Sequence, residues 1–226
     1  MRAYVLALIL LLTACAPLGR QYEVPMDKLT TADGQAIAFT YTAAKPGSPG
    51  AILLHQFRRD RHDYDSFAPQ LQKAGYNVIA IDVRGHGQSS GSAQNEADFQ
   101  NIPLDIAAAK NFLAKKGADT KHLLLIGASF TANSIINDAA TDKDVVAVIA
   151  ISPGMDFKGI KPEQGIRDVP ATLLIAAEDD PYSASSVRKL AELNPAVSTK
   201  IYPRGGHAVT LFNQTTLAKD ILAWLQ

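Results

Sequence analysis

The sequence has little of several features that mark particular classes of protein. It holds one cysteine, which excludes the intrachain disulfide framework of small secreted domains. Lys and Arg together number 22, as do Asp and Glu, so net charge gives no reason to expect nucleic acid as a partner. There are no internal repeats and no low-complexity tract, which excludes repeat architectures.

The N-terminal segment has the pattern of an export signal. Arg2 precedes the apolar run Val5–Leu12, which is too short to span a bilayer, since spanning needs ~20 residues. Leu12-Thr13-Ala14-Cys15 resembles the lipobox of bacterial lipoproteins, which implies that Cys15 carries a lipid anchor. An ordinary secretory signal with an incidental cysteine is the alternative. By the same resemblance, Ala16 in place of aspartate favours the outer membrane, with the protein facing the periplasm.

We therefore divide the chain into three parts. Residues 1–14 are predicted to be a cleaved signal peptide, residues 15–22 a lipidated tether, and residues 23–226 one folded domain. The oligomeric state is not readable from the sequence.

Apolar strands alternate with amphipathic helices along this domain. The predicted strands are Met26–Leu29, Ala36–Thr42, Ala51–Leu54, Asn77–Asp82, Leu123–Ile126, Val145–Ile151, Thr172–Ala177 and Thr199–Tyr202. The predicted helices are Tyr64–Ala74, Ile102–Lys116, Ala132–Ala140, Ser183–Leu193 and Leu211–Leu225. Alternation of this kind, with strands that are mostly near-continuous apolar runs, predicts an α/β fold with a mostly parallel sheet covered by helices on both faces.

Chemically capable residues follow four of these strands. They are His55-Gln56-Phe57, Gly127-Ala128-Ser129-Phe130-Thr131, Glu178-Asp179-Asp180 and Gly205-Gly206-His207. The carboxyl ends of parallel strands meet at one edge of a sheet, where ligands bind. A serine hydroxyl becomes a nucleophile when an imidazole takes its proton, and that imidazole needs a carboxylate to orient it. The order serine, acid, histidine is the one used by α/β-hydrolases.

These segments resemble those of the α/β-hydrolase superfamily, from about Ala36 to the C-terminus. Leu54–Phe57 is similar to the oxyanion loop, and Asp82–Ser89 to the Asp-x-Arg-Gly-x-Gly-x-Ser loop. Glu178–Pro181 resembles the acid loop of dienelactone-hydrolase-like members that lack a lid. The resemblance implies a sheet of about seven to eight strands and no cap domain.

The resemblance also implies roles for individual residues. Ser129 is the predicted nucleophile and His207 the general base and acid. Asp180 is the predicted orienting acid, with Asp179 as the second choice and Glu178 as the third.

The predicted oxyanion hole uses two backbone N–H groups. Phe130 supplies one, and Phe57 supplies the other, with Gln56 as its alternative. Gln56 and Thr131 stand where glycine or another small residue is common, which indicates an adjusted pocket or a reduced activity.

No cofactor and no metal are expected. Acidic residues and one histidine cluster just before the first long predicted helix, but their spacing matches no ligand motif. They are Asp60, His62, Asp63 and Asp65.

The predicted function is hydrolysis of carboxylic esters or thioesters of small to medium soluble substrates. Segment Ser152–Ala171 is rich in proline and glycine and too short for a helical cap, so we expect an open cleft lined by Phe57, Phe130 and Met155. The side chains of Phe57 and Phe130 are equally consistent with an ordinary core. The alternatives are a peptidase or lactone hydrolase on the same fold, and an inactive binding protein anchored in the envelope.

Overall fold

A twisted sheet forms the centre of the molecule in the computed structural model, which describes residues 28–226. The predicted signal peptide 1–14, the tether 15–22 and the lipid attachment at Cys15 lie outside the described residues. Within 28–226, no helix combines the length and apolarity needed to cross a membrane.

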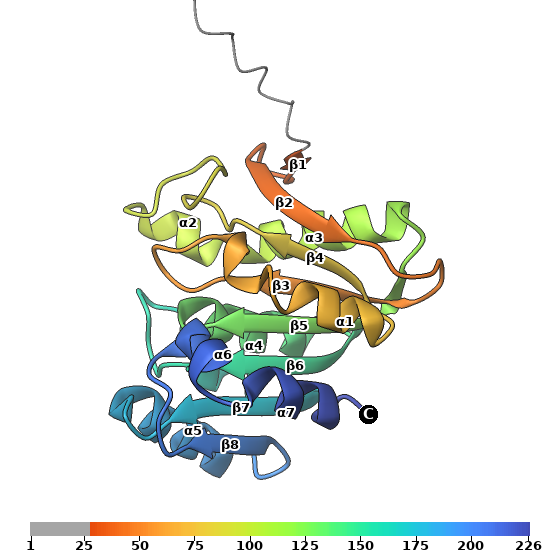
Figure 1. The fold of residues 1–226 in the computed structure, drawn as a ribbon. Helices are drawn as coiled ribbons and strands as arrows, with labels where there is room; N and C mark the ends of the chain where they lie inside the picture. The colour runs from red at the N-terminus through yellow and green to blue at the C-terminus, as the bar shows by residue number, and fades with distance from the viewer. Residues whose placement is uncertain (1–27) are drawn as a thin grey trace, which may run out of the picture.

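The described residues form one eight-stranded sheet with the order β1-β2-β4-β3-β5-β6-β7-β8 (Figure 1). The first two strands pair antiparallel with their neighbours, and the strands from β4 to β8 run parallel. The strands are β1 (Lys28–Thr30), β2 (Ala36–Thr42), β3 (Pro49–Leu54), β4 (Asn77–Ile81), β5 (Asp119–Ala128), β6 (Val145–Ile151), β7 (Ala171–Ala177) and β8 (Ser198–Tyr202).

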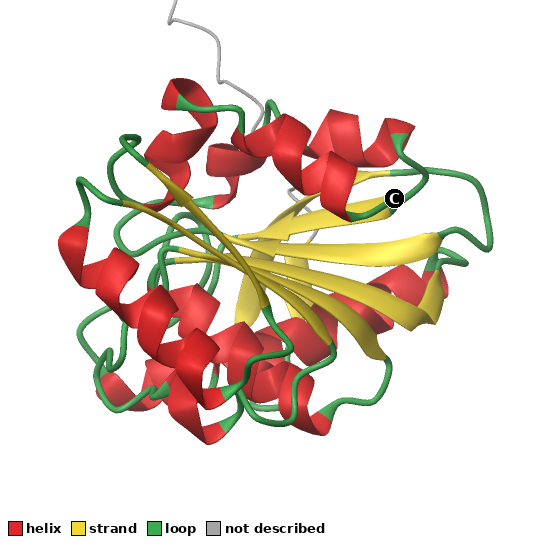
Figure 2. Cartoon of the chain, turned by 90° about the horizontal axis from the view of Figure 1, so that it is seen from below, coloured by secondary structure: helices red, strands yellow, loops and turns green. Residues whose placement is uncertain are grey.

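Helices cover both faces of the sheet, which gives three layers (Figure 2). One face is covered by α1 (Ala68–Lys73), α6 (Leu211–Gln214) and α7 (Leu217–Trp224). The other carries α2 (Glu96–Gln100), α3 (Ile102–Lys115), α4 (Phe130–Thr141) and α5 (Pro181–Leu193). Short 3₁₀ turns are η1 (Arg61–Tyr64), η2 (Pro162–Gln164) and η3 (Ala208–Thr210).

The central strands are apolar throughout because each of their faces is buried. In β3, Ile52 and Leu54 pack in the core under α3 and α4, whereas Ala51 and Leu53 pack in the core under α1 and α7. Successive side chains of a strand point to opposite faces, so a strand between two helical layers cannot alternate with polar residues. All four side chains are fully buried.

Most predicted strands are confirmed, and two of them have the predicted bounds, Ala36–Thr42 and Val145–Ile151. Strand β5 is longer than predicted, because it begins at Asp119 within a polar stretch that apolar periodicity does not detect. Helix α2 was not predicted. It is one short turn capped by Asn95, whose side chain accepts a hydrogen bond from the N–H of Ala97.

The helix predicted over Tyr64–Ala74 is confirmed in its second half, but its predicted start is wrong. The chain forms η1, which ends at Tyr64, and then α1, which begins at Ala68. Pro69 explains the break, because a proline has no N–H to donate and fits only the first turn of a helix.

The single terminal helix predicted over Leu211–Leu225 is also wrong, since it divides into α6 and α7 at Thr215. Thr215 has an extended backbone, and its hydroxyl donates to Leu211 O and accepts from Leu217 N–H. These side-chain bonds offer the backbone an alternative to a continuous helix.

No cap covers the sheet edge between β6 and β7, as predicted. The residues that join these strands contain the three-residue turn η2 and no longer helix. The carboxyl ends of the parallel strands are therefore not covered by an inserted domain.

Candidate active site

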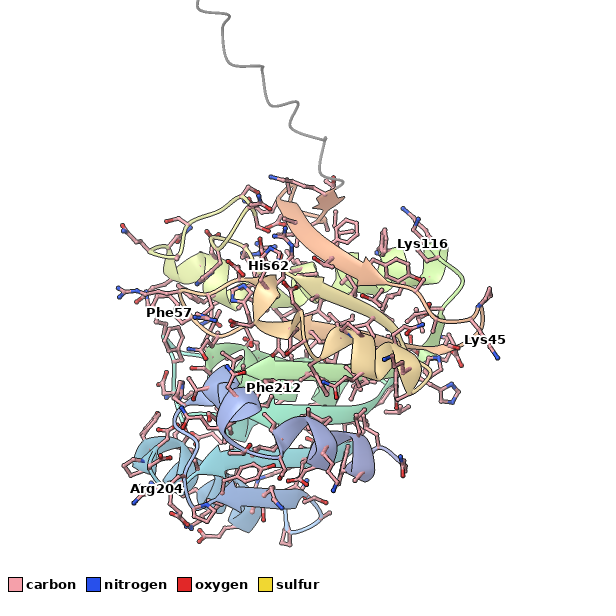
Figure 3. The ribbon with its side chains drawn as sticks, in the orientation of Figure 1. Lys45, Phe57, His62, Lys116, Arg204 and Phe212 are labelled. Atoms are coloured by element: carbon pink, nitrogen blue, oxygen red, sulfur yellow. The ribbon has the colours of Figure 1, made fainter. Side chains whose placement is uncertain are left out.

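The segments that the sequence singles out all lie at the edge of the sheet where the parallel strands end. Figure 3 shows Phe57, which follows β3, and Arg204, which follows β8, on this edge. Lys45 and Lys116 lie at the opposite edge. The site is therefore built from connections that are distant in sequence.

Ser129 stands on a sharp turn between β5 and α4. Its backbone has φ 61° and ψ −120°, a conformation that is unfavourable for a residue with a side chain. A Cβ atom on Gly127 would lie 2.7 Å from Thr131 O, so only glycine allows the strand and helix to approach this closely. The turn leaves Ser129 partly exposed.

His207 lies between Ser129 and Asp180. Its Nε2 is 2.9 Å from Ser129 Oγ, and its Nδ1 is 2.6 Å from Asp180 Oδ2. The His207 side chain is 43% exposed and that of Asp180 is 15% exposed, so the imidazole is more open to solvent than the carboxylate that orients it. The structure thus brings together the three residues predicted to form a triad.

The acidic residues next to Asp180 have other partners. Asp179 accepts hydrogen bonds from the N–H groups of Gly205 and Gly206, and these bonds hold the pKa of its carboxyl below the usual range. Glu178 pairs with Arg188 on the surface. Asp179 therefore shapes the turn before His207, and neither Asp179 nor Glu178 bonds to the imidazole ring.

Further bonds fix the loop that carries His207. Ser152, at the end of β6, accepts a hydrogen bond of 2.9 Å from the N–H of Ala208. Ser183 Oγ lies 3.5 Å from His207 Nδ1. Sequence reasoning missed both serines, because nothing in their local sequence places them beside the histidine.

Backbone strain is concentrated around this site. In residues 28–226, five non-glycine residues have positive φ, and each lies in a connection at the carboxyl edge of the sheet: Arg58, Ser129, Ser152, Lys158 and Ala208. Such conformations persist where the surrounding structure holds them, which is typical of functional sites.

His55 orients the peptide that is predicted to form half of the oxyanion hole. Its Nε2 accepts the N–H of Val83 at 3.1 Å, so the proton sits on Nδ1, which donates to Gln56 O at 2.8 Å. Burial lowers the pKa of His55 to about 4, which keeps the ring neutral near pH 7. Because the peptide is planar and trans, holding Gln56 O turns the N–H of Phe57 to the other side.

The N–H groups of Phe57 and Phe130 meet no acceptor in the part of the chain that the structure describes. Phe130 is the first residue of α4, so its N–H has no acceptor within the helix. Both groups are therefore available to a bound oxyanion, and their role stays a prediction.

The two residues that depart from the usual pattern have defined partners. Gln56 Oε1 accepts a hydrogen bond of 3.1 Å from the N–H of Val209, which ties the oxyanion loop to the histidine loop. Thr131 is fully buried, and its hydroxyl accepts the N–H of Ala128 at 2.9 Å. The same hydroxyl lies 3.1 Å from His55 O, so it connects the serine turn to the oxyanion loop.

Replacing Thr131 with valine is expected to lower the free energy of unfolding by about 1–3 kcal/mol, because the buried N–H of Ala128 loses its acceptor. Urea denaturation of the variant beside Thr131→Ser, which keeps the hydroxyl, measures the effect. A valine variant at least as stable as the serine variant would show that the hydroxyl does not hold the turn.

The ring of Phe130 does not line an open cleft, and that part of the prediction is wrong. Its side chain is 2% exposed and packs against Phe57, His86, Phe99 and Phe157, with ring centroids 5.3–5.9 Å apart. Phe57 and Met155 are partly buried at the edge of the same core. Phe99 and Phe157 were not predicted, because their contacts are tertiary.

No group of three His, Cys, Asp or Glu side chains in residues 28–226 is arranged to hold a metal ion. The acidic cluster before α1 is used locally instead. Asp60 caps η1, His62 pairs with Asp65, and Asp63 pairs with Arg59.

Residues 50–166, more than half of the chain, match the protein family described as "Serine aminopeptidase, S33". The chain is 30% identical over 146 residues to epoxide hydrolase A of Mycobacterium tuberculosis, a match that covers 63% of this chain and 44% of that protein. It is 31% identical over 146 residues to the monoglyceride lipase of Rattus norvegicus, covering 62% of this chain and 48% of the lipase. The matches thus span less than half the length of these relatives.

Among solved structures, the esterase Pf2001 of Pyrococcus furiosus is similar, with a TM-score of 0.73 and 21% identity. The similarity covers 88% of this chain and 90% of the esterase. It shows that the chain has the α/β-hydrolase fold, as predicted.

Proposed function

The chain belongs to the serine aminopeptidase family, and from this premise we propose that it is a serine hydrolase that cleaves carboxylic esters or thioesters. The observation that carries the proposal is the linear contact from Ser129 through His207 to Asp180, on a backbone turn that exposes the serine. Similarity to an esterase of the same fold supports the choice of ester substrates.

The contacts support a two-step mechanism. His207 Nε2 takes the proton of Ser129 as its Oγ attacks the ester carbonyl, and Asp180 stabilises the imidazolium that forms. The N–H groups of Phe57 and Phe130 stabilise the developing oxyanion. His207 then protonates the leaving alcohol or thiol, and water enters by the reverse steps to release the acid.

The surroundings of Ser129 favour esters over the aminoacyl substrates that the family description implies. An aminopeptidase must bind an α-ammonium group beside the scissile carbonyl. The aromatic cluster next to Phe130 instead carries cations at its rim, where Arg58 lies 5.4 Å from the ring centroid of Phe57 and Lys158 lies 4.6 Å from that of Phe99. These cations would repel an ammonium group.

The proposal predicts a preference for short acyl groups. Burial of each CH₂ of a substrate contributes about 0.8 kcal/mol, but a site without a cap encloses little of a long chain. With p-nitrophenyl esters, kcat/KM is expected to peak at acyl groups of about two to eight carbons. A peak at about twelve carbons or longer would contradict the proposed substrate class.

Amino-acid p-nitroanilides, assayed beside the esters, separate the esterase from a peptidase. Faster cleavage of the anilides would favour the peptidase. Absence of turnover on every substrate would favour the inactive binding protein.

A further inference from the structure

The first part of the loop between β6 and β7 ends in a tight hairpin. The N–H of Ile160 donates to Phe157 O at 2.9 Å, and the N–H of Phe157 donates to Ile160 O at 3.2 Å. Between them, Lys158 has φ 47° and Gly159 has φ 82°, the left-handed pair required by a type I′ turn. A lysine is unusual at such a position, so the surrounding contacts must hold the turn in place.

Side chains from several helices hold this hairpin. Asn133, buried in α4, accepts the N–H of Gly154 and donates to Ile160 O, each at 3.0 Å. Gln100 of α2 donates to Lys158 O at 2.9 Å. Tyr182 of α5 accepts the N–H of Met155 at 3.1 Å. The position of the hairpin is therefore fixed relative to Ser129, the N-cap residue of the helix that carries Asn133.

The hairpin places the ring of Phe157 against aromatic rings from connections on the other side of β5. Phe157 follows β6, yet its ring centroid lies 5.4 Å from that of Phe57, which follows β3, and 5.5 Å from that of Phe99 in α2. Because β5 lies between β3 and β6, the loop must cross the end of β5 in front of Phe130, whose ring is 5.3 Å away.

The order of the strands distinguishes the two sides of the site. His207 and Asp180 follow β8 and β7, so the leaving group, which His207 protonates, lies toward β7 and β8. The acyl group must then extend the other way, toward the connections after β3 and β4. That is where the rings of Phe57, Phe99 and Phe157 gather.

We propose that Phe157 closes the acyl side of the site and sets the longest acyl group that the protein accepts. The inference rests on the proposed function and adds the residue that determines specificity. A pocket of about 150 Å³ is lined by Phe99 and Ile160. The ring of Phe99 contacts that of Phe157, and the backbone of Ile160 pairs with that of Phe157. Shortening the Phe157 side chain is expected to open room for a longer acyl group beside Phe99.

The test compares wild type, Phe157→Ala and Phe157→Leu on p-nitrophenyl esters with acyl groups of two to twelve carbons. Each further methylene that the site buries is expected to raise kcat/KM by ~4-fold. The ratio of octanoate to acetate kcat/KM is expected to rise at least about tenfold in Phe157→Ala. Phe157→Leu keeps more apolar volume and is expected to give a smaller rise, and it serves as the test if the alanine variant does not fold.

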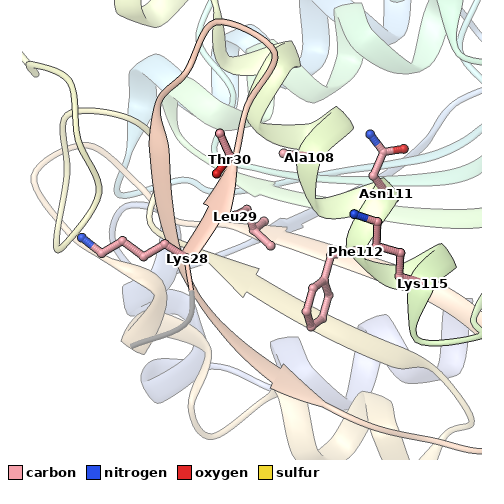
Figure 4. A pocket seen from close by; sticks show the side chains of 7 residues that line it. All are labelled: Lys28, Leu29, Thr30, Ala108, Asn111, Phe112 and Lys115. Atoms are coloured by element: carbon pink, nitrogen blue, oxygen red, sulfur yellow. The ribbon is translucent and has the colours of Figure 1, made fainter. Parts of the chain in front are cut away.

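Phe112→Ala is the matched control. Phe112 is a partly buried aromatic residue packed on Phe39, and it lines a pocket between β1 and α3 that contains none of the triad residues (Figure 4). An unchanged chain-length profile in both Phe157 variants, with acetate still hydrolysed, would overturn the inference and leave the proposed function in place. An equal shift in Phe112→Ala would overturn it as well. Wild-type protein that hydrolyses no ester would remove the proposed function and this inference together.

Discussion

Replacing Ser129 with alanine is expected to lower kcat for ester hydrolysis by about 10⁵- to 10⁶-fold, because the attacking atom is lost and only binding and the oxyanion hole remain. The variant is expected to fold, since the one hydrogen bond of Ser129 Oγ in the described part of the chain is to His207 Nε2. Initial rates on p-nitrophenyl acetate, with circular dichroism to verify folding, measure the effect.

Ser134→Ala provides the control for this loss. Ser134 is a buried serine one turn beyond the start of α4, the helix that follows Ser129, and its hydroxyl bonds only to Phe130 O, at 3.4 Å. The activity of Ser134→Ala is expected to stay within about threefold of wild type, because the hydrogen bond from Ser134 to Phe130 O is long and weak. If Ser129→Ala retained the activity of Ser134→Ala, Ser129 would not be the nucleophile.

Replacing Asp180 with asparagine is expected to lower kcat by about 10⁴-fold. An amide cannot stabilise the imidazolium, and its NH₂ group facing Nδ1 favours the tautomer in which Nε2 carries the proton and cannot accept that of Ser129. The comparison is with Asp179→Asn under the same assay.

Asp179→Asn is expected to cost less than about tenfold, because one amide oxygen can still accept both N–H groups that Asp179 Oδ1 receives, from Gly205 and Gly206. The two substitutions are chemically identical and lie at adjacent positions. The reverse ranking would assign the orienting acid to Asp179.

The layered sheet could be predicted because each buried strand shows its apolar pattern within its own short segment of sequence. A strand buried on both faces must be apolar throughout, so segments such as Val145–Ile151 are visible in the sequence without knowledge of their neighbours. The position of Ser129 follows from the same fact, since it comes directly after β5, whereas Asp180 lies three residues beyond β7 and His207 lies in the loop that follows β8.

Helix boundaries were harder to predict, because single residues decide them. Pro69 moves the start of α1, and the hydroxyl of Thr215 ends α6, although the apolar spacing on either side continues. Periodicity measures which face is buried and does not register these local hydrogen bonds.

The contacts that shape the site could not be predicted, because they join residues far apart in the chain. The hydroxyl of Thr131 bridges to His55 O, and the ring of Phe157 reaches Phe57 across the end of β5. In the sequence, Thr131 is a departure from a motif, and Phe157 is one aromatic residue in a loop rich in proline and glycine. Their roles depend on the order of the strands in the sheet, because that order determines which loops lie next to one another.

Covalent labelling tests whether Ser129 is an activated nucleophile. Incubation with a fluorophosphonate, followed by intact mass and peptide mass spectrometry, is expected to give one adduct, on Ser129, and none in Ser129→Ala. Failure of the folded wild-type protein to react, or an adduct on a different residue, would show that Ser129 is not an activated nucleophile.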